Sequence, residues 1–250
     1  MNNAPTHLIE AHALSQWPTG GRIAVEGFDL SVSEGEICAV VGEAGAGKTA
    51  ILEMLIGVAR PSRGRALVLG IDTAVNPIGA RRHLTYVSQQ AALCEPLTLL
   101  GNVAFFAAVG SPGPQRTAVD CENAMRTVGI AERDLRSPLA GLPRHRVIAA
   151  WLAVALLRDT PVVILDDPSR GVSGQDSLQL IESVGELRRR GKTVLMATGD
   201  ALFAGQLANR IVILKAGRKI AERRGSEVFG MSVAKLYLDY AGRVPTRVPS

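Results

Sequence analysis

The amino-acid sequence predicts an α/β fold, in which helices cover both faces of a mainly parallel β-sheet. Uninterrupted apolar runs, typical of strands buried on both faces, occupy residues 37–41, 162–165 and 193–197. Two segments with the apolar spacing of helices, residues 146–157 and 177–190, alternate with these runs along the chain. Because 47% of the 250 residues are hydrophobic, the chain can bury a core of this kind.

The first apolar run and the helix after it form the best defined unit. A glycine-rich turn follows the run, and Ile51, Leu52 and Leu55 then recur at the spacing of one helix face. The helical segment before the third run ends in three arginines, residues 188–190, and Gly191. Cations and a following glycine are typical of a helix C-terminus, so we expect the helix to stop there.

Shorter strand-like segments lie closer to the two ends of the chain. They occupy residues 23–32, 66–69, 211–214 and 218–221, and glycine-containing turns separate them. We expect these segments to form an added antiparallel β layer.

The middle of the chain has few strand signals. Between residues 89 and 160, the segments 100–109 and 119–128 have helical spacing, and a loop at residues 110–114 separates them. This region is therefore predicted to be an inserted α-helical subdomain.

Composition and cysteine spacing exclude several classes of protein. The longest apolar stretches are well short of the about 18 residues that span a bilayer. Residues 1–13 lack the basic patch and apolar stretch of a secretory signal, so we expect a cytoplasmic location. Cys38, Cys94 and Cys121 are too far apart for a metal or redox motif, and we expect buried free thiols. The net charge of +5 is only weak support for a nucleic-acid partner.

Residues 42–49 read G-E-A-G-A-G-K-T and fit the phosphate-binding pattern G-x-x-x-x-G-K-[ST], directly after a strand and before a helix. Glycines let backbone N–H groups converge on phosphate, and the helix N-terminus adds positive charge. The pattern predicts a P-loop NTPase that binds ATP, with Lys48 on the β and γ phosphates and Thr49 on Mg²⁺. The predicted nucleotide-binding residues are Gly42, Glu43, Ala44, Gly45, Ala46, Gly47, Lys48, Thr49 and Ala50.

Asp166 is the second candidate ligand of the metal. It follows the apolar run at residues 162–165 and precedes Asp167. A carboxylate at the carboxyl end of a buried strand beside the phosphate loop can hold Mg²⁺ through water. A solvated acidic turn is the alternative interpretation of the pair.

The phosphate loop, followed along the chain by the acidic pair at residues 166–167, resembles the ordered motifs of the ABC ATPase family. The resemblance to its ABC-2 exporter branch is carried by Leu97-Thr98, residues 101–103 and Phe105-Phe106. The resemblance covers nearly the whole chain. It implies a RecA-like parallel sheet core with an antiparallel β layer, formed by residues 1–88 and 161–235. Residues 89–160 would be the helical subdomain, and residues 236–250 a C-terminal tail.

The resemblance also assigns roles to residues outside the phosphate loop. Trp17 stands where the family stacks an aromatic ring on adenine, although a core or surface tryptophan is an equally open interpretation. Gln89 matches the glutamine that approaches Mg²⁺ and the attacking water. Asp167 occupies the position of the catalytic glutamate.

Four family positions are altered in this chain. The signature Leu-Ser-Gly-Gly-Gln, which caps the nucleotide of the opposite subunit, falls on residues 139–143, where Ala140 lacks a hydroxyl although Gly141 is kept. Asp167 is one methylene, about 1.5 Å, shorter than glutamate. Gly199 stands in place of the switch histidine, and Ser173 in place of the D-loop aspartate. Because these groups act on hydrolysis or on dimer closure, we expect ATP binding to persist and turnover to be slow.

The resemblance implies an ATP-binding subunit of an ABC-2-like membrane exporter, held at the inner face of the membrane by a permease. Its hydrolysis is expected to be weak or partner-dependent, in a dimer with itself or with a second, more complete ATPase subunit. One alternative is a non-catalytic regulatory or assembly subunit. A soluble nucleic-acid-associated ATPase is a third, but it usually has coiled-coil insertions or tandem cassettes that this chain has no room for, so we expect no nucleic acid partner.

Overall fold

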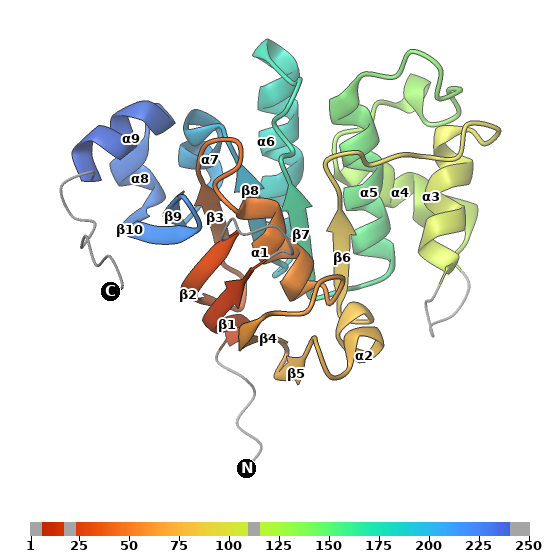
Figure 1. The fold of residues 1–250 in the computed structure, drawn as a ribbon. Helices are drawn as coiled ribbons and strands as arrows, with labels where there is room; N and C mark the ends of the chain where they lie inside the picture. The colour runs from red at the N-terminus through yellow and green to blue at the C-terminus, as the bar shows by residue number, and fades with distance from the viewer. Residues whose placement is uncertain (1–6, 18–23, 110–115, 241–250) are drawn as a thin grey trace, which may run out of the picture.

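The computed structural model describes residues 7–17, 24–109 and 116–240 (Figure 1). The loop expected at residues 110–114, and the tail beyond residue 240, lie outside the described residues. The strands are β1 His7–Gln16, β2 Val25–Ser33, β3 Ile37–Val41, β4 Arg63–Val68, β5 Ile71–Asp72, β6 Leu84–Val87, β7 Val162–Asp166, β8 Thr193–Thr198, β9 Arg210–Lys215 and β10 Arg218–Arg224. The helices are α1 Lys48–Leu55, α2 Pro77–Arg81, α3 Leu99–Ala108, α4 Ala118–Thr127, η1 Glu132–Asp134, α5 Arg144–Leu157, α6 Gly174–Arg189, α7 Ala201–Leu207, α8 Gly225–Val228 and α9 Val233–Tyr240.

The central sheet has six strands in the order β10-β9-β3-β8-β7-β6. All neighbouring pairs are parallel except β9 and β10, which are antiparallel. Every residue of β3, β7 and β8 is buried, as the three apolar runs predicted. The α/β fold expected from the sequence is therefore confirmed.

The two faces of the central sheet belong to two hydrophobic cores. Along β3, Ile37, Ala39 and Val41 face one core, which contains the buried residues of α3 to α7. Cys38 and Val40 face the other core, which α1 and the second sheet complete. This alternation follows from the period of two in a strand. Helix α1 is thus held between two sheets, which fixes the loop in front of it (Figure 1).

The second sheet is antiparallel, with four strands in the order β2-β1-β4-β5. Its strand β1 was not predicted from the sequence, because a register shift between Ala11 and Leu14 breaks the alternation of buried residues. Ala13, inside this irregularity, has a φ of 46°. A bulge of this kind hides a strand from any search for a period of two.

The prediction that β9 and β10 belong to the antiparallel layer was wrong. Strand β9 runs parallel to β3, with Cys38 opposite Arg210, and β10 forms the edge of the central sheet. The turn at Ala216 and Gly217, both with positive φ, gives the same hairpin signal in either sheet. Only the long-range pairing with β3 decides which sheet the hairpin joins.

Residues 89–160 contain the helices α3, α4, η1 and α5 and, in the described part, no strand. Thr98 and Thr117 cap α3 and α4 by accepting hydrogen bonds from the backbone N–H groups of Gly101 and Asp120. Helix α5 has nine buried residues and contacts α3, α4 and α6, so it is the central helix of this part of the molecule.

Several segments depart from the expectations made for them. The tail expected to begin at residue 236 continues as helix α9 to Tyr240, with Leu236 and Tyr237 buried. Cys38 and Cys121 are buried as expected, but Cys94 is exposed, because it lies in the irregular segment before α3 rather than in a core element. Across the ranges 7–17, 24–109 and 116–240, no helix combines the length and the apolar character needed to span a bilayer.

Candidate functional site

The predicted phosphate loop joins β3 to α1, and only glycine fits at two of its positions. A Cβ on Gly42 would lie 2.5 Å from the carbonyl oxygen of Leu214, and one on Gly47 would lie 2.2 Å from that of Ala24. Gly47 also has a φ of 101°, in the left-handed region. The backbone therefore packs tightly around the loop and presents the N-terminus of α1 to its interior.

Lys48 folds back over this loop. Its Nζ donates hydrogen bonds to the carbonyl oxygens of Gly42, at 2.6 Å, and of Glu43, at 2.9 Å. Burial lowers the pKa of Lys48, while the nearby carboxylates of Asp167 and Asp166 oppose that shift. The ammonium group is thus held at the mouth of the loop, where phosphate oxygens would replace the two carbonyl partners.

Thr49 and Asp166 meet beside the loop, as the sequence predicted for a metal site. The Thr49 hydroxyl lies 3.1 Å from Oδ2 of Asp166 and 3.3 Å from Oδ1. Tyr86, at the end of β6, donates a longer hydrogen bond of 3.4 Å to Oδ2. Burial raises the pKa of Asp166, and Asp167 raises it further, while the Thr49 and Tyr86 hydroxyls oppose the shift.

These oxygen donors suit Mg²⁺, which prefers carboxylate, hydroxyl and water oxygens. Within the described ranges, no three His, Cys, Asp or Glu side chains cluster closely enough to cage a metal by themselves. Mg²⁺ usually keeps several waters and shares phosphate oxygens, so two protein donors are a fitting set. The site could thus hold the ion of a Mg²⁺–nucleotide complex.

Asp167 is held by three neighbours at the end of β7. Gln89 Nε2 donates to Asp167 Oδ2 at 3.3 Å, and the Thr198 hydroxyl donates to Oδ1 at 3.2 Å. The Thr198 hydroxyl also lies 2.8 Å from that of buried Ser169. The backbone N–H of Asp167 donates to the carbonyl of Ala197, and its φ is 50°. The carboxylate is therefore turned toward β8 and tied there.

Lys48, Thr49, Gln89, Asp166 and Asp167 line one cavity of about 530 Å³ at the carboxyl ends of β3, β7 and β8. Nine of the residues that line it were predicted from the sequence: Ala44, Gly45, Gly47, Lys48, Thr49, Ala50, Gln89, Asp166 and Asp167. Ala24, Arg170 and Gly199 complete the lining. Arg170 was missed, because an arginine in a turn gives no signal of its own in the sequence.

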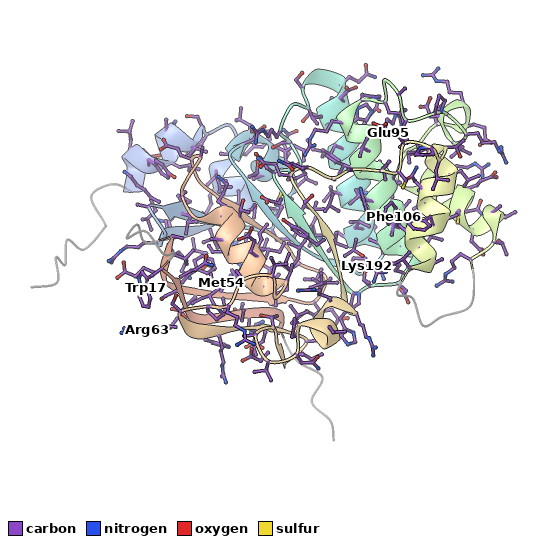
Figure 2. All side chains as sticks on the ribbon, turned by 45° about the vertical axis from the view of Figure 1, so that its right-hand side comes forward. Trp17, Met54, Arg63, Glu95, Phe106 and Lys192 are labelled. Atoms are coloured by element: carbon purple, nitrogen blue, oxygen red, sulfur yellow. The ribbon has the colours of Figure 1, made fainter. Side chains whose placement is uncertain are left out.

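Six predicted site residues do not line this cavity: Gly42, Glu43 and Ala46 of the phosphate loop itself, and Trp17, Ala140 and Gly141. Trp17 is 40% exposed, and the guanidinium of Arg63 lies 5.1 Å from its ring centroid. Figure 2 shows the two side chains together at the edge of the molecule. Ala140 and Gly141 lie in the turn before α5, and the role expected for them concerns a nucleotide on an opposite subunit.

Two long-range hydrogen bonds, one to the phosphate loop and one to the segment at Gln89, could not be predicted from the sequence. The hydroxyl of Tyr237, in α9, accepts a hydrogen bond from the Glu43 N–H at 2.9 Å. Arg144, at the start of α5, donates to the carbonyl of Gln89 at 2.7 Å. The first contact ties the phosphate loop to the C-terminal helix, and the second ties the Gln89 segment to α5.

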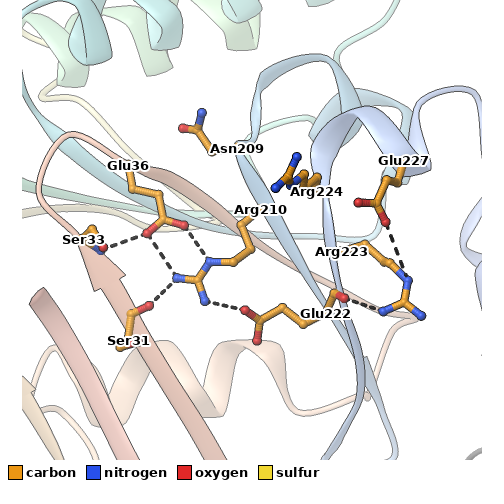
Figure 3. A pocket seen from close by; sticks show the side chains of 9 residues that line it. All are labelled: Ser31, Ser33, Glu36, Asn209, Arg210, Glu222, Arg223, Arg224 and Glu227. Carbon is orange, nitrogen blue, oxygen red and sulfur yellow. Dashed lines mark hydrogen bonds and ion pairs between the residues drawn. The ribbon is translucent and has the colours of Figure 1, made fainter.

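A second and larger cavity, of about 750 Å³, lies at the start of β9, beside the end of β10 and the turn before β3, and is shown in Figure 3. Its centre is Arg210, which donates to Glu36 at 2.6 Å and to Glu222 at 2.7 Å. These bonds raise the pKa of Arg210 although burial opposes the charge. The ion pairs of Arg210 with Glu36 and Glu222 join β9 to β10 and to the turn before β3.

The chain is similar in sequence and fold to known proteins. The family model described as ABC transporter matches residues 25–170. The daunorubicin/doxorubicin resistance ATP-binding protein DrrA of Streptomyces peucetius is 32% identical over 245 residues, covering 95% of this chain and 72% of DrrA. The macrolide export ATP-binding/permease protein MacB of Rhodopseudomonas palustris (strain HaA2) is 30% identical over 244 residues, covering 94% of this chain and 35% of MacB. A solved ATP-binding subunit of an ABC transporter superposes with a TM-score of 0.76 at 26% identity, covering 94% and 99% of the two chains.

Proposed function

Because this chain belongs to the ABC transporter family, we propose that it is the ATP-binding subunit of an exporter, bound to the inner face of the membrane through a permease. The observation that carries the proposal is the meeting of the phosphate loop, Lys48, Thr49 and Asp166 in one cavity. The names of DrrA and MacB, which refer to drug resistance and macrolide export, support the export direction.

In this function the loop residues would bind the phosphates of ATP, and Asp166 would help to hold Mg²⁺. The N–H groups at the start of α1 and the ammonium of Lys48 would take the phosphates of ATP. Thr49 and Asp166 would hold Mg²⁺, which neutralises phosphate charge when bound. The cytoplasmic location, and the division into a core at 1–88 and 161–235 with a helical subdomain at 89–160, belong to the same proposal.

Weak or partner-dependent hydrolysis is a further part of the proposal. The side chain of Asp167 is one methylene shorter than that of glutamate. Its two carboxylate oxygens accept hydrogen bonds from Gln89 and Thr198. A general base must lie within hydrogen-bond reach of the proton it removes, and a positioned base contributes roughly 10² to 10⁴ in rate. Gly199 adds no imidazole on the other side of the cavity. A dimer with a more complete ATPase subunit would supply one better site.

The test is a comparison of nucleotide binding and turnover in matched variants. Lys48→Ala should weaken binding of Mg²⁺·ATP by at least about 10-fold, because it removes a charge-assisted phosphate contact. The control Lys235→Ala removes an exposed lysine of α9 and should bind as the unaltered chain does. If the purified chain takes up no Mg²⁺·ATP, the proposed function is wrong.

A second candidate is a regulatory subunit whose ATP-bound state stabilises a complex without turnover. The hydrogen bonds from Gln89 and Thr198 to Asp167 favour this candidate, because they occupy one acceptor site on each carboxylate oxygen and hold the carboxylate toward β8. The two candidates differ in their response to Asp167→Asn. Loss of turnover in this variant, with assembly kept, indicates a catalytic subunit. Loss of assembly with Lys48→Ala, and no effect of Asp167→Asn on any property, indicates a regulator.

A further inference from the structure

Among the described residues that line the nucleotide cavity, Arg170 is the one positively charged residue whose side chain has no hydrogen-bond or ion-pair partner. The cavity is lined by two carboxylates, Asp166 and Asp167, and by two cations, Lys48 and Arg170. Lys48 is bonded to the loop carbonyls. The guanidinium of Arg170 makes no hydrogen bond or ion pair with the described part of the chain, and the residue is exposed.

The backbone that carries Arg170 is fixed, although its side chain is free. The N–H of Arg170 donates to the carbonyl of Asp167 at 3.2 Å, which closes a turn after β7. Ser169, the residue before it, is buried and lies 2.8 Å from the hydroxyl of Thr198. The turn therefore holds Arg170 at the mouth of the cavity, beside the end of β8.

Gly199 lines the same cavity as Arg170 and carries no side chain to fill it. A Cβ on Gly199 would meet only the carbonyl oxygen of Gly42, at 3.7 Å, which is an ordinary contact. Gly199 has no positive φ, so its backbone does not require glycine. The absence of a side chain at Gly199 therefore leaves space in the cavity that Arg170 also lines.

We propose that Arg170 contacts the terminal phosphate of the nucleotide held in its own phosphate loop, in the space beside Gly199. This inference rests on the proposed function and assigns the recognition of a third phosphate to one residue. A guanidinium forms paired, charge-assisted hydrogen bonds with phosphate oxygens. Without Arg170, the cavity would carry two carboxylates against the single charge of Lys48.

The prediction concerns selectivity between a triphosphate and a diphosphate. The purified chain is titrated with Mg²⁺·AMP-PNP and with Mg²⁺·ADP, so that no turnover is needed. Arg170→Ala should weaken AMP-PNP binding about 10- to 100-fold and leave ADP binding within about 2-fold, as expected for loss of one charged hydrogen-bond pair. Arg170→Lys should be intermediate, since it keeps the charge without the paired geometry. Arg188→Ala, an exposed arginine near the end of α6, controls for net charge.

A double variant tests whether the two positions serve the same phosphate. Gly199→His in the Arg170→Ala background should recover part of the AMP-PNP affinity, because an imidazole at this position supplies another hydrogen-bond donor to the cavity. The proposal is overturned if Arg170→Ala binds AMP-PNP as tightly as the unaltered chain, or if it loses both nucleotides equally. If the unaltered chain binds neither nucleotide, the proposed function fails first, and the two failures are thus distinguished.

Discussion

The hydroxyl of Tyr237 joins the C-terminal helix to the phosphate loop, accepting from the N–H of Glu43 at 2.9 Å and donating to the carbonyl of Leu214 at 2.7 Å. Tyr237 is buried, and its burial raises its pKa, so the hydroxyl stays protonated and keeps both roles. A single side chain therefore fixes the second residue of the loop against the end of β9. The loop is shaped before any phosphate enters it.

Removing this hydroxyl should loosen the loop. Tyr237→Phe keeps the ring and leaves the Glu43 N–H without its partner, which costs about 1–3 kcal/mol for a buried donor. We expect Mg²⁺·AMP-PNP affinity to fall about 3- to 20-fold, measured by titration calorimetry. Leu238→Ala changes an exposed residue of the same helix and is the control. Unchanged affinity in Tyr237→Phe would show that the loop keeps its shape without α9.

The hydroxyl of Thr198 should matter for both stability and turnover. Thr198→Val keeps the shape but removes the donor to Asp167 and the acceptor for the Asp200 N–H, at 3.0 Å. We expect a loss of about 1–3 kcal/mol in the free energy of unfolding by urea. Thr198→Ser keeps the hydroxyl and should stay close to the unaltered chain. Turnover faster in Thr198→Val than in the unaltered chain would mean that the hydroxyl restrains Asp167.

Asp166 should destabilise the nucleotide-free chain at neutral pH. Burial raises its pKa above the ordinary 3.8, so the folded state binds its proton more tightly than the unfolded state does. The contribution of Asp166 to stability is therefore most favourable below pH 3.8, and it is lost as the pH rises through the raised value.

Asp166→Asn should accordingly raise the melting temperature of the nucleotide-free chain at pH 7, by about 2–4 °C. The difference from the unaltered chain should shrink as the pH is lowered toward 4, and the variant should lose Mg²⁺-dependent nucleotide binding. Melting curves at several pH values, without metal, check this. A lower melting temperature for Asp166→Asn at pH 7 would contradict it.

The three cysteines should differ sharply in reactivity. Burial raises the pKa of Cys38 to about 12 and also raises that of Cys121, whereas Cys94 is exposed. Because the thiolate is the reactive form, a thiol reagent at pH 8 should modify one cysteine quickly in the native chain and all three in denaturant. Cys94→Ser should abolish the fast reaction. Fast modification of two thiols would place a second cysteine at the surface.

Sequence reasoning located most of the nucleotide site, because that site is built from short, local patterns. The run from Gly42 to Thr49 needs only its own spacing to predict a turn and a helix N-terminus. The strands β3, β7 and β8 are fully buried, so each could be predicted from its own apolar run without knowing which strand it pairs with. Asp166 could be found from its place at the end of such a run. What the sequence determined by itself is thus the glycine-rich loop between β3 and α1 and the α/β class of the fold, and it predicted Thr49 and Asp166 as the metal ligands.

The tertiary structure alone decided how distant segments meet. The hairpin β9–β10 joined the central sheet because of its pairing with β3, which no local signal encodes. Tyr237 is 194 residues away from Glu43, and Arg170 and Gly199 line one cavity because β7 and β8 are neighbours. Contacts between residues far apart in the sequence depend on how whole helices and strands pack. In another fold, the same residues would lie apart.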